Sequence, residues 1–333
     1  MKFANRTLFS VCLISFCALS QSDARAININ DQSAKGLGRA HGFLMGQEFS
    51  LSRIAAEMPD LAYKVTVANT QFSSTFPKIK EKLDHELLKA YGEKAYEKYI
   101  VEAQNKMRQV AESQPLSRNL SIDFIQQVQA RAKGKLEPQI LNYLLAVQYQ
   151  TNPAGEIADG FVQRYETDGS GKAKGVQLSL KLPLSWVGKE GERPHTLQGW
   201  TSEGGTGMEF VSLQIRDVQG APLTKAEIEE SVRSGDLRTT LPAGATYIGS
   251  GNINIEKQPG YWLQFGLNSQ RGELSLYQNL LQYNIFLNNK SIILGCSAGA
   301  EVNEKVKADI AATRIRPLCQ RILNSLVFPQ VYK

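Results

Sequence analysis

The sequence predicts an α+β protein, in which a helical N-terminal domain is followed by a layered domain with a mainly antiparallel sheet. The first observation is a helical spacing of apolar residues from about residue 40 to residue 150. The second is a change after residue 153, where apolar residues begin to alternate with polar ones, as in half-buried strands. The third is the order of the later segments, which is hairpin, hairpin, helix, several strands and terminal helix. Such segregation indicates stacked layers and not a parallel doubly wound sheet.

The composition is that of an ordinary globular protein with room for two domains. The chain has 333 residues, of which 42% are hydrophobic and 21% are charged. Its formal net charge is +6 at pH 7, with basic and acidic residues interspersed. This pattern is typical of a solvated surface and excludes a nucleic-acid footprint. After the N-terminal segment, no stretch reaches the roughly 18 to 20 apolar residues that span a bilayer.

Residues 1–26 have the three parts of a secretory signal peptide. Two basic residues open the segment, an apolar run covers residues 8–19, and the small-x-small site 24–26 follows. We therefore expect cleavage after Ala26 and a soluble periplasmic protein, with secretion as the alternative. A retained lipoprotein anchor is disfavoured, because Cys12 and Cys17 follow bulky residues where a lipobox needs a small one.

Residues 27–152 are expected to form a helical domain of four to six amphipathic helices. In residues 77–92 the apolar face consists of Ile79, Leu83, Leu87 and Ala90, and Gly92 supplies a C-terminal stop. The next helix has an apolar face made of Tyr96, Tyr99, Ile100, Ala103, Met107 and Val110. None of the helices is apolar all round, so their faces should pack on one another or on the second domain. The glycine-spaced stretch "AHGFLMGQEF" (40–49) is expected to be a close-packed helix crossing.

Residues 153–333 are expected to form the second domain. The predicted strands lie in residues 160–168, 175–186, 195–202, 208–218, 246–258, 260–269, 276–289 and 290–297. A short helix precedes the last four strands, and Thr224 followed by Glu227 forms a capping box at its start. Two helical segments, 300–312 and 317–328, end the chain.

Two cysteines, Cys296 and Cys319, remain after removal of the leader. In an oxidising compartment an even pair predicts one disulfide, and two separate buried thiols are the alternative. One straight helix over residues 301–326 would carry Cys319 roughly 27 Å from its start. We therefore expect a reversal near residues 312–316 and a new helix at Pro317, which returns Cys319 to Cys296.

The stretch "SIILGCSAGA" (291–300) contains the G-x-S-x-G spacing of a serine hydrolase at Ser297. In α/β-hydrolases the histidine follows the serine in the chain, and no histidine follows Ser297. His195 lies in a polar loop, whereas His41 and His85 lie in the other domain, where we expect structural or solvent-facing roles.

A dyad of Ser297 with Lys305 or Lys307 needs no histidine, but both lysines belong to a solvated helix face. We therefore interpret the motif as a flexible turn at the end of a strand. In that interpretation Gly295 and Gly299 are free to adopt positive φ.

The sequence predicts no cofactor and no metal site. "YIGSGN" has a G-x-G at Gly249 and Gly251 but lacks the third glycine and the following helix of a dinucleotide site, so we expect a bend or bulge. No His, Cys, Asp or Glu group has metal-ligand spacing. The three tryptophans on predicted strands are expected to pack in the core or on the sheet, and they are Trp186, Trp200 and Trp262.

The second half resembles the PsbP-like families, which include bacterial periplasmic proteins of the DcrB type. The resemblance rests on "LSLKLPLSW" (178–186), on the antiparallel run of residues 247–294 and on the closing helix "RPLCQRILNSLVF" (316–328). It implies a PsbP-like α-β-α sandwich that serves as a non-catalytic assembly or binding module. The helical first half is an extension beyond the one-domain members of the family.

These observations predict an exported, non-catalytic binding or assembly module of the bacterial envelope. Its partner is expected to be an envelope protein or a small ligand, with no nucleic acid and no transmembrane segment in the mature chain. Two alternatives are an envelope serine hydrolase that uses Ser297 and a carrier of a small apolar ligand held between the sandwich and the helices.

Overall fold

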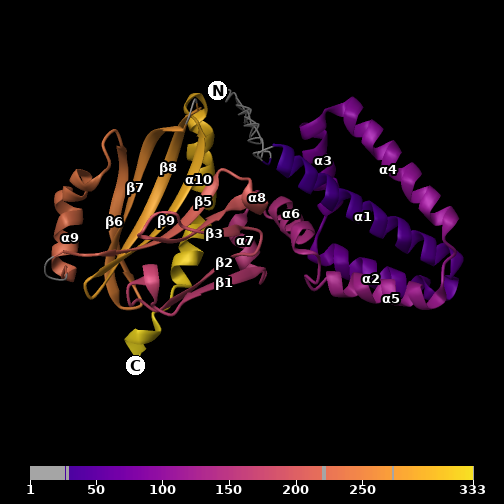
Figure 1. The fold of residues 1–333 in the computed structure, drawn as a ribbon, viewed down its shortest axis with the longest axis horizontal. Coiled ribbons are helices and arrows are strands. Elements are labelled where there is room, and N and C mark those ends of the chain that lie inside the picture. Colours follow the sequence, from indigo (N-terminus) through magenta and orange to yellow (C-terminus); the bar gives the residue numbers. More distant parts are fainter. Residues whose placement is uncertain (1–26, 28–29, 220–222, 272–273, 333) are drawn as a thin grey trace, which may run out of the picture.

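The computed structural model of the protein describes residues 27, 30–219, 223–271 and 274–332. The predicted leader, with Cys12 and Cys17, lies outside the described residues. Helices fill the first half of the chain and an antiparallel sheet fills the second, so the predicted α+β class is confirmed (Figure 1). No helix in the described ranges is both long and apolar enough to cross a membrane.

The helical half contains α1 (Asp31–Glu57), η1 (Pro59–Leu61), α2 (Ala62–Thr75), α3 (Ile79–Tyr91), α4 (Glu93–Ser113), α5 (Arg118–Arg131) and α6 (Pro138–Gln148). The short helix α7 (Pro153–Ala158) follows and packs in the core of the second half. Asn30 caps α1, because its side chain accepts hydrogen bonds from the first backbone amides of the helix. Gly92, with φ at 73°, ends α3 as predicted, and α4 begins directly after it.

In this half α6 is buried on nearly all sides, although Gln139 is exposed and Asn142 and Gln148 are partly exposed. Its buried residues are Ile140, Leu141, Tyr143, Leu144, Leu145, Ala146 and Val147. The helix lies between the other helices and the sheet half, so both sides of it are covered (Figure 1). A helix in this position needs no solvent-facing stripe.

The second half contains β1 (Val162–Thr167), η2 (Gly171–Ala173), β2 (Leu178–Pro183), β3 (Val187–Glu190), β4 (Thr196–Thr201), α8 (Ser202–Gly205), β5 (Glu209–Asp217), α9 (Lys225–Ser234), η3 (Asp236–Thr240), β6 (Thr246–Ile255), β7 (Gln258–Arg271), β8 (Leu274–Leu287), β9 (Lys290–Glu301), η4 (Val302–Glu304), α10 (Lys305–Asn324) and η5 (Pro329–Tyr332). The main sheet has the order β3-β4-β5-β9-β8-β7-β6, and all its neighbours are antiparallel. Thr224 and Glu227 form the predicted capping box at α9.

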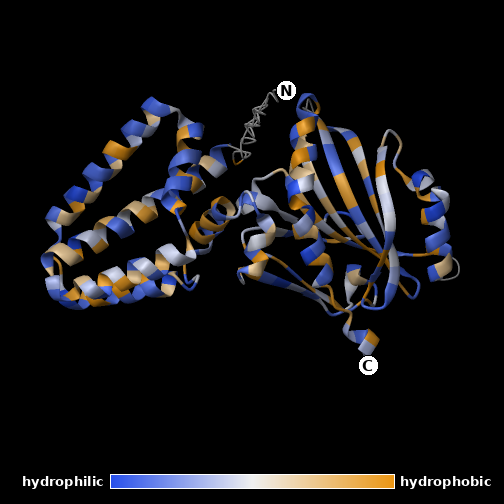
Figure 2. Cartoon of the chain, turned by 180° about the vertical axis from the view of Figure 1, so that it is seen from behind, coloured by the Kyte–Doolittle hydropathy of each residue, from blue (hydrophilic) through white to orange (hydrophobic). Residues whose placement is uncertain are grey.

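Helices cover the two faces of the main sheet. On one face α10 packs on β8 and β9, and the β1–β2 hairpin packs on the same core. On the other face α9 and η3 cover β6 and β7. Apolar and polar residues alternate along the strands between these layers (Figure 2). Trp186 and Trp200 lie in the core, as predicted.

The segment with Ser297 is not a turn, which corrects the prediction. β9 continues through it to Glu301, and the backbone of Ser297 pairs with Phe210 on one side and Leu280 on the other. Neither Gly295 nor Gly299 has a positive φ. The small residues are accommodated inside a sheet, where Met208 and Ser212 approach the two glycines.

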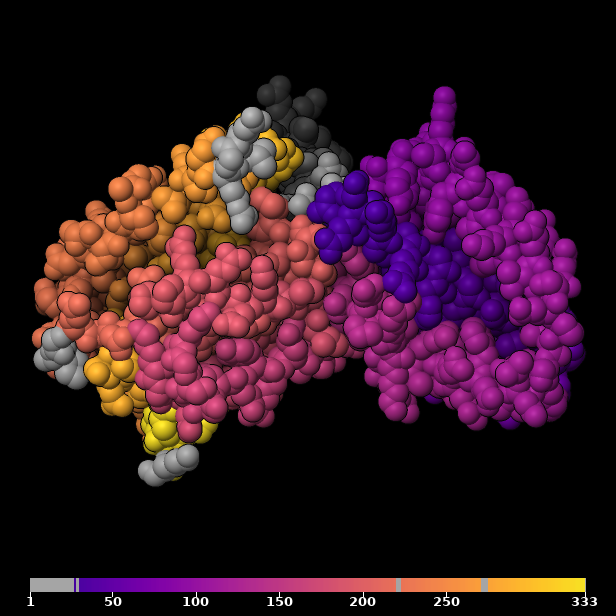
Figure 3. Space-filling model, in the orientation of Figure 1, coloured from indigo at the N-terminus to yellow at the C-terminus, as the bar shows by residue number. Residues whose placement is uncertain are grey.

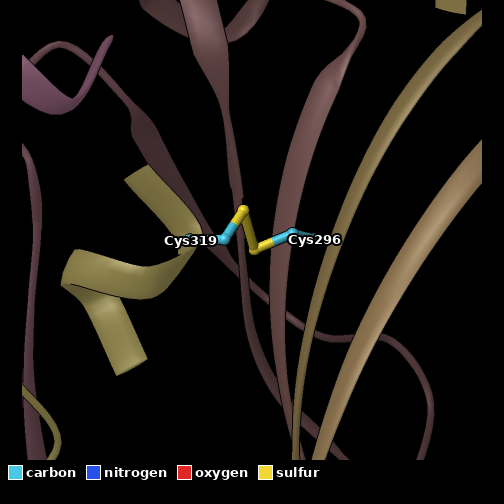
Figure 4. Close-up of a disulfide and its surroundings, with 2 residues drawn as sticks. All are labelled: Cys296 and Cys319. Atoms are coloured by element: carbon cyan, nitrogen blue, oxygen red, sulfur yellow. A yellow bond between two sulfur atoms is a disulfide. The ribbon is translucent and has the colours of Figure 1, made fainter. Parts of the chain in front are cut away.

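The predicted break at Pro317 is also wrong, because α10 is one helix with Pro317 inside it. The two cysteines nevertheless lie at disulfide distance, with Cα atoms 6.3 Å apart (Figure 4). The helix folds back along β9. Cys296 lies five residues before the end of the strand, roughly 17 Å, and Cys319 lies 14 residues into the helix, roughly 21 Å. These similar lengths bring the cysteines together without a second reversal.

Candidate functional site

An apolar groove runs between α1 and α4 and is closed below by α5. Its volume is about 570 Å³. It is lined by α1 from Gly42 to Ile54, by α4 from Ala103 to Ala111, by the connection 114–117 and by the start of α5. We call it the α1–α4 groove. In the space-filling view, α1 is recessed between α4 and α5 (Figure 3).

The groove exists because the apolar face of α4 is not packed on the core. No residue of α4 is buried, although the helix is strongly amphipathic. Met107 is half-buried, and Val110 is 50% exposed. The sequence predicted this face correctly, but the expectation that it packs against other helices fails for its C-terminal half.

The N-terminal half of α4 is attached to α1 and α3 by a polar network around His41. Nε2 of His41 lies 2.6 Å from Oδ1 of Asp84, and the hydroxyl of Tyr96 donates to the same oxygen at 2.7 Å. Nδ1 of His41 lies 3.0 Å from the hydroxyl of Tyr99. The carboxylate therefore fixes the orientation of the ring.

His41 has a structural role, one of the two expected for it. The side chain is fully buried, and burial lowers its pKa although Asp84 opposes this effect. A neutral imidazole can donate from Nε2 to Asp84, while the Tyr99 hydroxyl beside Nδ1 donates to the carbonyl of Gly38 at 3.2 Å. Burial also raises the pKa of Tyr99. These contacts hold the N-terminal half of α4 against α1 and α3.

The other end of the groove is closed by Arg53. Its Nη2 donates to the carbonyl of Gln114, directly after α4, and its Nε pairs with Glu57 at 2.6 Å. Polar contacts therefore hold α4 to α1 at both ends, and the apolar stretch between them stays open.

Glycine forms part of the groove wall. A Cβ at Gly46 would meet nothing within 4 Å, and one at Gly42 would meet only the Tyr99 hydroxyl, at 3.7 Å. The predicted close-packed crossing at these glycines is therefore wrong. The space beside them belongs to the groove.

Arg131 holds the side of the groove that α5 forms. The guanidinium of Arg131 lies over the rings of Phe43 and Phe124, at 4.8 and 5.2 Å, and donates to Gln47. Phe124 lines the groove, so this contact holds one of its aromatic walls in a defined position.

The charge of the groove lining has one sign. Arg53 and Lys106 line the groove together with no acidic side chain, and the charge of Arg53 is already paired with Glu57, so among the described residues Lys106 supplies the unpaired cation. Within the described part of the chain, Lys106 forms no ion pair. An apolar channel with a cationic rim is complementary to a molecule with an apolar body and an anionic end.

Ser297 is not brought near any predicted base. It is 6% exposed and lies on the sheet face opposite α10. His195 binds through its backbone to Ile215, five residues along β5 from the partner of Ser297, roughly 17 Å away. His41 lies among the helices.

The two lysines considered as bases and His85 lie on solvated surfaces. Lys305 and Lys307 are exposed on α10, where Lys305 lies over the ring of Tyr277 and Lys307 pairs with Glu304. His85 is exposed on α3.

The G-x-G of β6 is a bulge, as predicted, because the register shifts between Tyr247 and Gly249. The ring of Trp262 on β7 lies where side chains at Gly249 and Gly251 would otherwise lie. A Cβ at Gly251 would lie 2.5 Å from its ring, and one at Gly249 would lie 3.1 Å from it. The indole lies across β6 beneath Arg316, so it packs on the sheet. In the described ranges no group of three His, Cys, Asp or Glu side chains could hold a metal ion.

Sequence reasoning missed a buried ion pair where the two halves meet. Glu209 is 2% exposed, and its carboxylate accepts from Arg314 of α10 at 2.6 Å and from Ser202 at 2.6 Å. Arg314 also donates to the carbonyl of Gln150 at the end of the helical half. The alternation of β5 could have indicated this burial, because Glu209 lies two residues before the inward-facing Val211 and so faces the same side of the strand.

Glu156 of α7 was missed as well. It is 1% exposed, and it accepts from the backbone and hydroxyl of Ser185 at 2.6 and 2.7 Å. Burial raises its pKa to about 7, although these hydrogen bonds oppose the change. A single glutamate among the small and apolar residues of "PAGEIA" is the sequence signal for this position.

The comparisons with known proteins concern the sheet half. No protein-family model matches the chain, and no curated protein matches its sequence. The structure is similar to PsbP (CyanoP) of Synechocystis sp. PCC 6803, with 16% identity, 50% of this chain and 92% of that chain covered, and a TM-score of 0.33. It is similar to the Ran-binding protein Mog1p of Saccharomyces cerevisiae, with 7% identity, coverage of 50% and 95%, and a TM-score of 0.33.

A third match is LpqN of Mycobacterium tuberculosis, which is involved in cell envelope biogenesis. The identity is 14%, the coverage is 53% of this chain and 96% of that chain, and the TM-score is 0.30. At these identities the likeness concerns the fold alone. The matched structures are PsbP-like and related folds, and they match the half of the chain for which the sequence predicted that resemblance.

Proposed function

We propose that this protein is an exported, non-catalytic binding protein of the bacterial envelope, which carries a single-chain amphiphile with an anionic end. The ligand lies in the α1–α4 groove. The observation that supports this proposal is the apolar face of α4, which lies over a groove with none of its residues buried. Amphipathic helices normally gain their stability by burying such a face.

The size of the groove favours a small molecule over a partner helix. Its volume of about 570 Å³ lies within the range of ligand sites, roughly 300–1,000 Å³. A ten-residue helix with a diameter of 10 Å occupies roughly 1,200 Å³. Polar contacts of Tyr99 and Arg53 join α4 to α1 at the two ends of the groove.

The charge of the lining selects the head group. Lys106 faces a site whose lining has no acidic side chain, which favours a carboxylate or a phosphate over a cation. A non-catalytic role is supported by the setting of Ser297, which is buried within a strand away from His195. Export is supported by the leader pattern of residues 1–26.

Binding is tested by titration calorimetry with dodecanoate, dodecanol and dodecyltrimethylammonium. We expect dodecanoate to bind most tightly. Gly46→Phe places a ring in the groove from a position where an added Cβ meets nothing within 4 Å, and it should weaken dodecanoate binding at least about tenfold, or 1.4 kcal/mol. Gly46→Ala is the matched control, because it adds a methyl group and leaves the groove open.

The head-group assignment is tested by charge reversal on α4. Lys106→Glu should weaken dodecanoate and leave dodecanol unchanged, whereas Lys94→Glu, on the same helix but outside the groove, should change neither. Equal affinity of wild type and Gly46→Phe for every probe would overturn the groove as the binding site. So would the finding that only a partner protein, and no amphiphile, competes for this face.

Export is tested by the intact mass of the protein recovered from the periplasm. A chain that begins at Ile27 supports the proposal. Full-length protein found only in the cytoplasm contradicts it.

A further inference from the structure

Glu86 is a buried carboxylate on the apolar face of α3. It shares this face with Ile79, Leu83 and Leu87, and it is 2% exposed. Within the described ranges, no lysine, arginine or histidine forms an ion pair with it. A buried carboxylate without a cation is costly in free energy. The sequence carries a signal of this, since Glu86 follows Ile79 by seven residues in an otherwise regular apolar stripe.

The backbone nitrogen of Ile27 donates a hydrogen bond to Glu86. It lies 2.9 Å from Oε2, and the side chain of Ile27 is 1% exposed in the helical core. In the unprocessed chain this nitrogen is an amide, which offers one donor and no charge. Ile27 is also the residue that follows the cleavage site inferred from the leader pattern alone. The hydrogen bond to Glu86 and the predicted cleavage site are independent observations, and both identify the backbone nitrogen of Ile27.

We propose that removal of the leader turns this nitrogen into an α-ammonium group that forms a buried ion pair with Glu86. Hydrolysis of the Ala26–Ile27 peptide bond by an envelope endopeptidase consumes one water. The new carboxylate leaves with the leader, and the nitrogen becomes a primary amine. The amine takes up a proton, because α-amino groups titrate near 7.7–8.0. Processing thereby supplies the cation that the buried carboxylate otherwise lacks.

The consequence is that the mature helical domain is stabilised by its own N-terminus. Ile27 is held against α3, and α1 begins four residues later at Asp31. The ion pair therefore connects the start of the mature chain to the centre of the helical core. The proposal rests on the export proposed above, but not on the ligand of the groove.

The test compares two purified proteins, one that begins at Ile27 and one that retains Ala26, each with Glu86 or with Glu86→Gln. Both are made by cleavage of an N-terminal fusion. We expect the protein that begins at Ile27 to have a thermal midpoint several degrees higher than the Ala26 form. In the Glu86→Gln background this difference should disappear. An extra residue that merely clashed would lower the midpoint in both backgrounds and would overturn the proposal.

A second readout reports the amine directly. Reductive methylation at neutral pH should modify the exposed Lys94 in all four proteins. The α-amine of Ile27 should be methylated slowly in the protein that has Glu86 and rapidly in the Glu86→Gln variant. Equal rates overturn the ion pair. Dodecanoate titration of the same proteins tests the proposed ligand separately. If dodecanoate does not bind, the comparison of thermal midpoints still tests the ion pair.

Discussion

Nη2 of Arg314 lies 2.6 Å from Oε1 of Glu209, and together they form an ion pair where the sheet half meets the helical half. The arginine comes from α10 and also binds the carbonyl of Gln150, so one side chain contacts both halves of the chain. The carboxylate is almost fully buried. The free energy of this junction therefore depends on keeping charge and counter-charge together.

Replacement of the arginine should destabilise the protein strongly. Arg314→Leu leaves the buried carboxylate of Glu209 without the guanidinium that faces it, and we expect a loss of about 3 kcal/mol. Denaturant unfolding measures this loss. Arg321→Leu, on the same helix at an exposed position, is the control and should change little. An effect of Arg314→Leu as small as that of the control would contradict the role of the pair.

Glu156 should make stability depend on pH. Its native pKa is about 7 because of burial, against an ordinary value of 4.5. Between these values the native state holds a proton that the unfolded state has released. The free energy of unfolding therefore falls as pH rises through this window, by about 3 kcal/mol in total. Below pH 4.5 both states are protonated and the dependence ends.

Glu156→Gln removes this dependence. Unfolding curves of wild type and variant between pH 4 and pH 8 should differ most in slope within the window, and Glu97→Gln, an exposed control, should follow the wild type. Parallel curves for wild type and Glu156→Gln would show that the group titrates normally.

Two glycines of α1 should respond in opposite directions to the same substitution. A Cβ at Gly36 would lie 2.0 Å from the ring of Tyr143, which also packs against Gly204 of the sheet half. Gly36→Ala should therefore cost about 1–3 kcal/mol. Gly46→Ala meets open space and should stabilise the helix by up to about 1 kcal/mol. Thermal unfolding compares the two, and equal shifts would argue against both environments.

Loss of Asp84 should release the N-terminal half of α4. Asp84→Ala removes the acceptor of His41 and of Tyr96 together, and the expected cost is about 2–3 kcal/mol. Hydrogen exchange should then rise first in the first two turns of α4. Glu81→Ala, exposed on the same helix, serves as the control. Unchanged exchange in α4 would mean that the network does not attach it.

The cysteine pair should stabilise the sheet half. Closing a loop with a sequence separation of 23 corresponds to about 3 kcal/mol in the chain-entropy model. The double variant Cys296→Ala, Cys319→Ala should lose a similar amount in denaturant unfolding. Two thiols that alkylate freely in the denatured, unreduced protein would rule out the bond.

Local patterns were sufficient to predict most of the helices and strands. The face of α3, the stop at Gly92 and the capping box of α9 depend on neighbours within a few residues, and the structure reproduces them. β3 was missed, because all its residues are exposed and its four residues carry no alternation. The candidate site was predicted only in part. The apolar face of α4 was visible, but a face alone does not say whether another helix covers it.

By itself, the sequence determined the α+β class and the order of most segments, and it predicted the pairing of Cys296 with Cys319 over two separate thiols, because periodicity and chain order are local or countable. Only the tertiary structure showed that α10 is one helix with Pro317 inside it. The two cysteines can meet without a break because β9 extends five residues beyond Cys296 before the helix returns along it. The tertiary structure also decided that Gly46 opens a groove and that Glu86 faces Ile27. Such contacts join residues far apart in the chain. Their free energies depend on what finally lies opposite each side chain.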